Sequence, residues 1–93
     1  MVRLKWLGHA AWQLEVDGKN VLIDPFITNN PAAPVKLDEL GKVDVVIVTH
    51  DHFDHVGDAF EICRRNDALF VALYELKVKA EQNGVKRTMG ANI

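Results

Sequence analysis

The sequence predicts an α+β domain, in this chain a mixed sheet with two helices. Polar and apolar residues alternate over residues 2–24 between turn-forming residues, as in antiparallel strands. Beyond residue 42, short apolar segments alternate with segments of helical periodicity, as in parallel strands joined by helices. Both kinds of strand in one small chain favour a mixed sheet.

Length and composition limit the classes of function. The 93 residues suffice for a single domain, 1–93, because a chain of this size builds one modest core. A formal net charge of -2 and scattered basic residues predict no positively charged surface for binding nucleic acid or an anionic membrane. No long apolar stretch follows Met1–Trp6, so neither a signal peptide nor a membrane span is expected. A cytoplasmic location is expected instead.

Three antiparallel strands are expected first. Residues 2–7 and 11–17 alternate in character, with Val2, Leu4 and Trp6 on one face, and predict a strand pair with one face in water. Residues 17–20, Asp-Gly-Lys-Asn, have turn chemistry, and an almost unbroken apolar strand follows over 20–24.

A long loop and a buried strand come next. Prolines at 25, 31 and 34 interrupt regular structure, and residues 38–41 predict a short helical turn. Residues 43–48 are apolar on both faces apart from Asp44, as in a strand covered on both sides. Only two helices are available to cover it.

The last part of the chain alternates helix and strand. Apolar residues at helical spacing predict a helix over 54–65, with Cys63 packed in the core, and residues 68–72 predict a strand. A second helix is expected from residue 73 or 74 to 82, ended by Asn83-Gly84. Residues 85–93 resemble the start of one more strand.

The chemistry concentrates in residues 49–55, Thr-His-Asp-His-Phe-Asp-His, directly after the buried strand. Alternate side chains of an extended segment share a side, so His50 and His52 can bind one ion, while Asp54 and His55 can reach a second. Imidazole and carboxylate donors favour zinc, with manganese, iron or nickel as alternatives, over calcium. Two adjacent divalent metal ions are therefore predicted.

This motif matches the His-x-His-x-Asp-His signature of the metallo-β-lactamase superfamily. With residues 6–10 (Trp-Leu-Gly-His-Ala), 22–26 (Leu-Ile-Asp-Pro-Phe) and 56–58 (Val-Gly-Asp), the chain resembles metal-dependent hydrolases related to the ascorbate-phosphate lactonase. The resemblance implies a four-layer αβ/βα sandwich with a dinuclear site. It also implies hydrolysis of an ester, lactone, amide or phosphoester bond in a small-molecule substrate.

The resemblance also implies roles for single residues. His50 and His52 would bind the first metal, and Asp54 and His55 the second, with Asp54 also the catalytic residue that holds or activates water. Asp24 would lie beside the ligands. His9 could face the pocket or be a hydrogen-bonded turn histidine, and both readings stay open.

Outer-shell hydrogen bonds hold metal ligands in place, which makes Asp24, Asp51 and Thr49 candidates for orienting the imidazoles. Asp51 could equally be a solvated loop residue.

The motif supplies four protein ligands, whereas two catalytic zinc ions use about six unless one bridges. Proteins of this family continue well past this length and contribute further ligands. The chain is therefore expected to be an amino-terminal half, incomplete at its carboxyl end, and completed by a carboxy-terminal half-chain or by homo-oligomerisation. Alternatives are a noncatalytic metal-binding module and an interaction module with the same half-fold.

Overall fold

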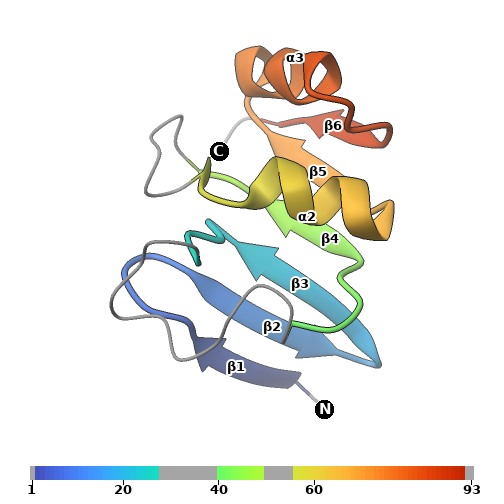
Figure 1. Cartoon of the computed structure of the whole chain (residues 1–93). Helices are drawn as coiled ribbons and strands as arrows, with labels where there is room; N and C mark the ends of the chain where they lie inside the picture. Colours follow the sequence, from blue (N-terminus) through green and yellow to red (C-terminus); the bar gives the residue numbers. More distant parts are fainter. Residues whose placement is uncertain (1, 28–39, 50–55, 92–93) are drawn as a thin grey trace.

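A computed structural model describes residues 2–27, 40–49 and 56–91. Within these ranges it has one mixed sheet of six strands in the order β1-β2-β3-β4-β5-β6, with two helices (Figure 1). The elements are β1 (Val2–Trp6), β2 (Trp12–Val16), β3 (Lys19–Ile23), β4 (Val45–Ile47), α2 (Ala59–Asn66), β5 (Leu69–Ala72), α3 (Tyr74–Gln82) and β6 (Thr88–Gly90). The predicted fold class is confirmed.

The sheet changes from antiparallel to parallel at β3. Strands β1, β2 and β3 form the predicted antiparallel meander, and β4, β5 and β6 continue parallel to β3. The β2–β3 turn has positive φ at Asp17 (49°) and Gly18 (80°), the pair of left-handed residues that a tight hairpin turn uses. Strand β6 confirms that residues 85–93 contain one more strand.

Both helices lie on the same face of the sheet (Figure 1). Leu22, Val46 and Phe70 are neighbours in register on adjacent strands and are fully buried. Helix α2 covers them, with the Phe60 ring 5.5 Å from that of Phe70. Helix α3 packs against β5 and β6 through its buried Leu76 and Ala80.

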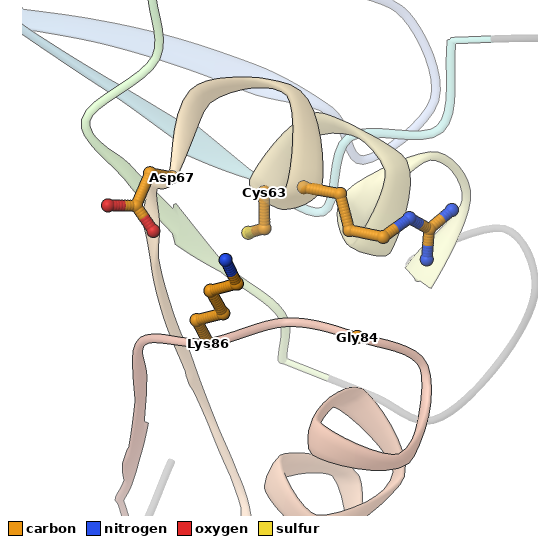
Figure 2. A pocket seen from close by; sticks show the side chains of 5 residues that line it. Cys63, Asp67, Gly84 and Lys86 are labelled. Atoms are coloured by element: carbon orange, nitrogen blue, oxygen red, sulfur yellow. The ribbon is translucent and has the colours of Figure 1, made fainter.

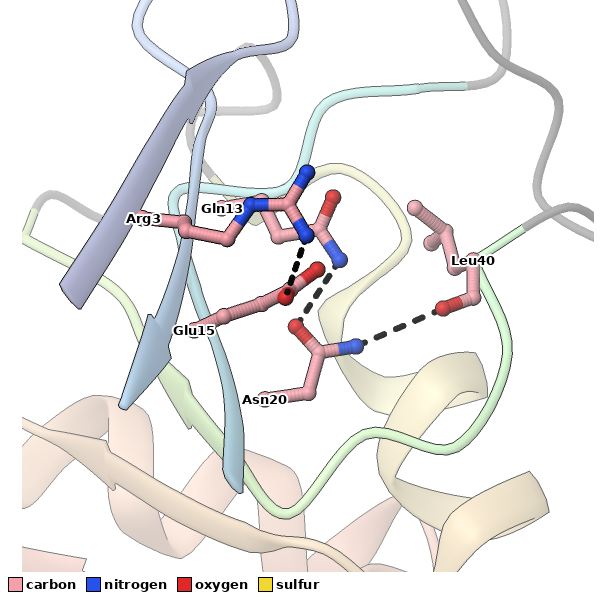
Figure 3. A network of polar contacts seen from close by, with 5 residues as sticks. All are labelled: Arg3, Gln13, Glu15, Asn20 and Leu40. Carbon is pink, nitrogen blue, oxygen red and sulfur yellow. Dashed lines mark hydrogen bonds and ion pairs between the residues drawn. The ribbon is translucent and has the colours of Figure 1, made fainter. Parts of the chain in front are cut away.

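On this face the first strands present polar side chains, joined in a network (Figure 3). The Arg3 guanidinium lies 3.6 Å from the Glu15 carboxylate. The Gln13 amide donates to Asn20 Oδ1 at 2.9 Å, and the Asn20 amide donates to the Leu40 carbonyl at 3.3 Å. The network ties the meander to the segment that leads into β4.

The opposite face of the first strands corrects one expectation. Alternation in β1 predicted a wet polar face and a buried apolar one, yet its apolar side chains are exposed, at 63% for Val2, 62% for Leu4 and 52% for Trp6. Arg3 and Lys5 are exposed as well, because the described helices pack against β4, β5 and β6.

The helix predicted over 54–65 also needs correction. Among the described residues, α2 begins at Ala59, because Gly57 has a left-handed φ of 44° that a continuous helix cannot contain. Asp54 and His55 lie outside the described residues, as do residues 38 and 39 of the helical turn predicted over 38–41. In the described ranges, no helix has the length and apolar character needed to cross a membrane.

Candidate metal centre

The carboxyl ends of β1, β3 and β4 meet at one edge of the sheet. Strand β1 is antiparallel to β2 and β2 to β3, so β1 runs in the same direction as β3, and β4 is parallel to both. The turn over 7–11, the segment 24–27 and Thr49 therefore lie at this edge, which we call the carboxyl edge. Thr49 is the last described residue before the histidine motif.

Asp24 binds Thr49 through both carboxylate oxygens. Oδ1 accepts the Thr49 backbone N–H at 2.7 Å, and Oδ2 accepts the Thr49 hydroxyl at 2.6 Å. Asp24 is 3% exposed and has a φ of 48°, and its own N–H donates to the Ile47 carbonyl at 2.8 Å. Charge-assisted bonds of this kind are short and strong, so Asp24 fixes the residue that precedes His50.

A second set of contacts fixes the other flank of the motif. The Asp58 carboxylate accepts the Ile27 N–H at 3.0 Å, and the Asp58 N–H donates to the Pro25 carbonyl at 3.0 Å. Asp58 thus joins the start of α2 to the segment after β3 and makes no side-chain cap bond to its own helix.

Gly57 makes this junction possible. A Cβ at position 57 would lie 2.5 Å from Phe26 Cα and 2.7 Å from the Pro25 carbonyl oxygen. Both are backbone atoms, so a larger residue would displace the segment. Both flanks of the motif are therefore held against residues 24–27.

His9 lies in the turn between β1 and β2 at the same edge. Its carbonyl accepts the Trp6 indole N–H at 2.8 Å, and its backbone φ is 54°. Its exposed imidazole meets the Phe26 ring edge-on, with centroids 5.9 Å apart. His9 is thus a turn histidine at the carboxyl edge, and its contact with the substrate or with the outer shell of the metal site stays a prediction.

The four predicted ligands, His50, His52, Asp54 and His55, lie outside the described residues, as does Asp51. Within the part that the structure describes, no three His, Cys, Asp or Glu side chains cluster as metal ligands would. The donor set of the motif, three imidazoles and a carboxylate, fits a zinc-like divalent ion. Of the residues suggested to orient the predicted ligands, Asp24 and Thr49 are hydrogen-bonded to each other.

A cavity of about 350 Å³ lies at the other end of α2, lined by Cys63, Arg64, Asp67, Gly84 and Lys86 (Figure 2). Burial raises the pKa of the Cys63 thiol to about 12, and the charge of Arg64 offsets only part of this. A thiol that stays protonated is a poor nucleophile. Cys63 is therefore not activated as a nucleophile in this cavity, and it packs in the core as predicted.

Residues 4–90 match the sequence profile of the metallo-beta-lactamase superfamily. A UPF0173 metal-dependent hydrolase of Caldivirga maquilingensis is 55% identical over 91 residues, which cover 97% of this chain and 40% of that protein. Its counterpart in Methanopyrus kandleri is 51% identical over 92 residues, 99% of this chain and 40% of that protein. The chain thus spans about two fifths of the length of these relatives.

Solved structures agree. Igni18, described as a novel metallo hydrolase from Ignicoccus hospitalis KIN4/I, superposes with a TM-score of 0.88 at 44% identity, over 99% of this chain and 40% of its own. CmlA, a diiron β-hydroxylase from Streptomyces venezuelae, shares the fold with a TM-score of 0.78 at 19% identity, over 97% of this chain and 20% of its own. With the profile match over nearly all of its length, the chain belongs to the metallo-β-lactamase superfamily.

Proposed function

We propose that this chain provides the metal-binding part of a hydrolase that acts on an ester, lactone, amide or phosphoester bond of a small molecule. The observation that carries the proposal is the double contact of Asp24 with Thr49, which fixes the residue before the motif at the carboxyl edge. The similar proteins named metal-dependent hydrolases support the general class.

In this proposal His50 and His52 hold one divalent ion, and Asp54 and His55 hold a second. When bound, such ions lower the pKa of water to about 7 and polarise the bond that is cleaved. Zinc is the first choice, with manganese, iron or nickel as alternatives, because the donors combine nitrogen and oxygen. A cytoplasmic location belongs to the proposal and agrees with the single buried thiol, Cys63.

The chain's own residues would position the metal motif and accept the proton of the attacking water. Asp24 orients Thr49 and with it the start of the motif, and Asp58 and Gly57 hold the segment that follows the motif. Asp54 would accept a proton from the attacking water, and His9 would contact the substrate or the outer shell. Such supporting contacts set the geometry on which metal affinity depends.

The first experiment measures metal content and turnover together. The purified chain is loaded with zinc or manganese, and bound metal is counted by elemental analysis for the wild type and for His52→Ala. Hydrolysis is then measured on a phosphodiester and lactone panel, with and without the carboxy-terminal part of a relative. We expect His52→Ala to lower both metal content and turnover. Unchanged metal content in His52→Ala would disprove the ligand assignment.

A noncatalytic metal-binding module is the second candidate, because the motif offers four ligands where two catalytic zinc ions use about six. In that case the chain would bind metal through His50, His52 and His55. It would hydrolyse none of the panel substrates, even with the complementary polypeptide present.

A further inference from the structure

The cavity at the carboxyl end of α2 lies between the ends of the two helices. Its volume of about 350 Å³ falls in the range of about 300–1,000 Å³ that small-molecule sites have. Helix α2, roughly 12 Å long, separates the cavity from the flank of the metal motif at Gly57 and Asp58. The residues that line it come from the end of α2 and from the segment after α3: Cys63, Arg64, Asp67, Gly84 and Lys86.

Two arginines join the walls of the cavity. Arg64 of α2 donates to the carbonyl of Asn83, the C-cap residue of α3, at 2.8 Å. Arg87, after α3, donates to the carbonyl of Asp67, the C-cap residue of α2, at 3.0 Å. Each arginine thus binds the carboxyl end of the other helix, where a positive charge is favourable. These bonds give both guanidinium groups a structural role and fix the separation of the walls.

The Lys86 ammonium and the Asp67 carboxylate have no such structural role. Within the described ranges, neither side chain makes a hydrogen bond or an ion pair, although both line this cavity. Figure 2 shows Lys86 extending from the segment after α3 toward the end of α2, where Asp67 and Cys63 lie. The cavity therefore holds two opposite charges that do not pair with each other.

The buried wall of the cavity is neutral. Cys63 is 2% exposed, and burial raises the pKa of its thiol to about 12, so this side chain is uncharged at neutral pH. Gly84 adds no side chain, and a Cβ at that position would lie 3.4 Å from Arg64 Cδ. A ligand would therefore meet uncharged atoms between the Asp67 and Lys86 side chains.

These charges select among the classes of small ligand. A simple anion would be repelled by the Asp67 carboxylate, and a simple cation would be repelled by Lys86 and Arg64. A small molecule that carries both an ammonium and a carboxylate group can make a charge-assisted hydrogen bond on each wall. Free α-amino acids have this pair of groups.

We propose that the cavity binds a small zwitterion of the α-amino acid class, whose ammonium group pairs with Asp67 and whose carboxylate group pairs with Lys86. The site lies at the opposite end of α2 from the metal motif, needs no metal and does not depend on the proposed function. Both side chains are exposed, and water screens exposed charge pairs, so the dissociation constant should be about millimolar.

The test titrates the isotope-labelled 93-residue chain with L-alanine in EDTA and follows the backbone amide signals by NMR. We expect saturable shifts at Asp67, Gly84 and Lys86 and none at Thr49. Propionate lacks the ammonium group of alanine, and ethylamine lacks its carboxylate. Each of these two probes should therefore bind at least about fivefold more weakly than L-alanine.

Matched variants locate the contacts. Asp67→Asn removes the charge and keeps the left-handed backbone, with a φ of 51°, which asparagine tolerates. Its control is Asp17→Asn, the same substitution at a φ of 49° in the β2–β3 turn. Lys86→Gln removes the charge on the other wall, and its control, Arg65→Gln, removes a positive charge of α2 that does not line the cavity. We expect the cavity variants to weaken L-alanine binding at least fivefold and the controls less than twofold.

Three results would overturn the inference. The first is the absence of saturable shifts when L-alanine is added to the folded wild-type chain. The second is equal weakening by the cavity variants and their controls. The third is binding of propionate or ethylamine as tight as that of L-alanine, because the site would then recognise a single charge. Should Lys86→Gln fail to fold, Asp67→Asn and its control decide the second result.

Discussion

Replacing Thr49 by valine tests the contact that holds the start of the metal motif. The substitution keeps the shape of the side chain and the backbone N–H that Asp24 Oδ1 accepts, and removes the hydroxyl that donates to Oδ2 at 2.6 Å. Asp24 is 3% exposed, so solvent does little to replace the hydroxyl donor that the substitution removes.

A hydrogen bond to a charged group contributes about 1.5–3 kcal/mol, so Thr49→Val should lower the free energy of unfolding by that amount. For a domain of this size, this corresponds to a fall in Tm of roughly 6–24 °C. Urea denaturation followed by tryptophan emission measures the change, because Trp6 and Trp12 lie in the same sheet.

The control is Thr88→Val. The Thr88 hydroxyl also donates to a carboxylate, Glu81 Oε2 at 2.8 Å, but this pair is exposed. Loss of this exposed hydrogen bond should therefore lower the free energy of unfolding clearly less than Thr49→Val does. A double-mutant cycle with Asp24→Ala should give a coupling between Asp24 and the Thr49 hydroxyl of similar size to the Thr49→Val effect. Equal and small effects of Thr49→Val and Thr88→Val, or no coupling, would show that the Thr49 hydroxyl makes no strong hydrogen bond to Asp24.

Gly57→Ala should destabilise the chain more than Gly18→Ala, measured as Tm. Both positions have positive φ, which costs alanine about 1–2 kcal/mol. Of the two, only position 57 would bring the new Cβ against backbone atoms, 2.5 Å from Phe26 Cα. Equal losses of Tm in the two variants would contradict the packing described. Cys63 should resist alkylation at pH 8 in the folded chain and react after denaturation. Because its thiol pKa is raised from 9.0 to about 12, the folded state keeps a proton that the unfolded state loses, so stability should fall from pH 9 toward 12 in the wild type and less in Cys63→Ala. A pH dependence equal in both would contradict this.

Periodicity alone predicted most of the secondary structure. Alternation identified the meander, and the helical spacing of apolar residues identified α2 and α3, because local pattern and burial agree there. The sequence pattern did not predict the break before α2, because Val56, Phe60 and Cys63 keep helical spacing across Gly57. Only the close approach of residues 25–26, distant in sequence, requires a left-handed residue at that point.

Alternation shows that Val2, Leu4 and Trp6 share a face of the sheet, but it does not show on which face the helices lie. The helices connect successive parallel strands added in one direction, and such crossovers are right-handed, so both fall on the same side. The expectation that only two helices would be available to cover the sheet was informative, because the described structure leaves one face open.

At the site, residue types indicated metal chemistry, and the resemblance placed Asp24 beside the ligands. The direct pairing of Asp24 with Thr49 depends on the parallel register of β3 and β4, a contact 25 residues apart in sequence with no local signal. Asp58 stands at the start of its helix, where a carboxylate commonly caps the first turn. It instead binds the Ile27 N–H, because the helix start lies against the segment after β3.

We propose that the residues between Thr49 and Val56 bind two divalent ions at the carboxyl edge. Anomalous diffraction at the zinc absorption edge, from crystals of the chain grown with zinc and the complementary polypeptide, tests it most directly. We expect two anomalous peaks beside Thr49, both weakened in His52→Ala crystals. Crystals of the same complex without anomalous peaks at that edge would contradict it.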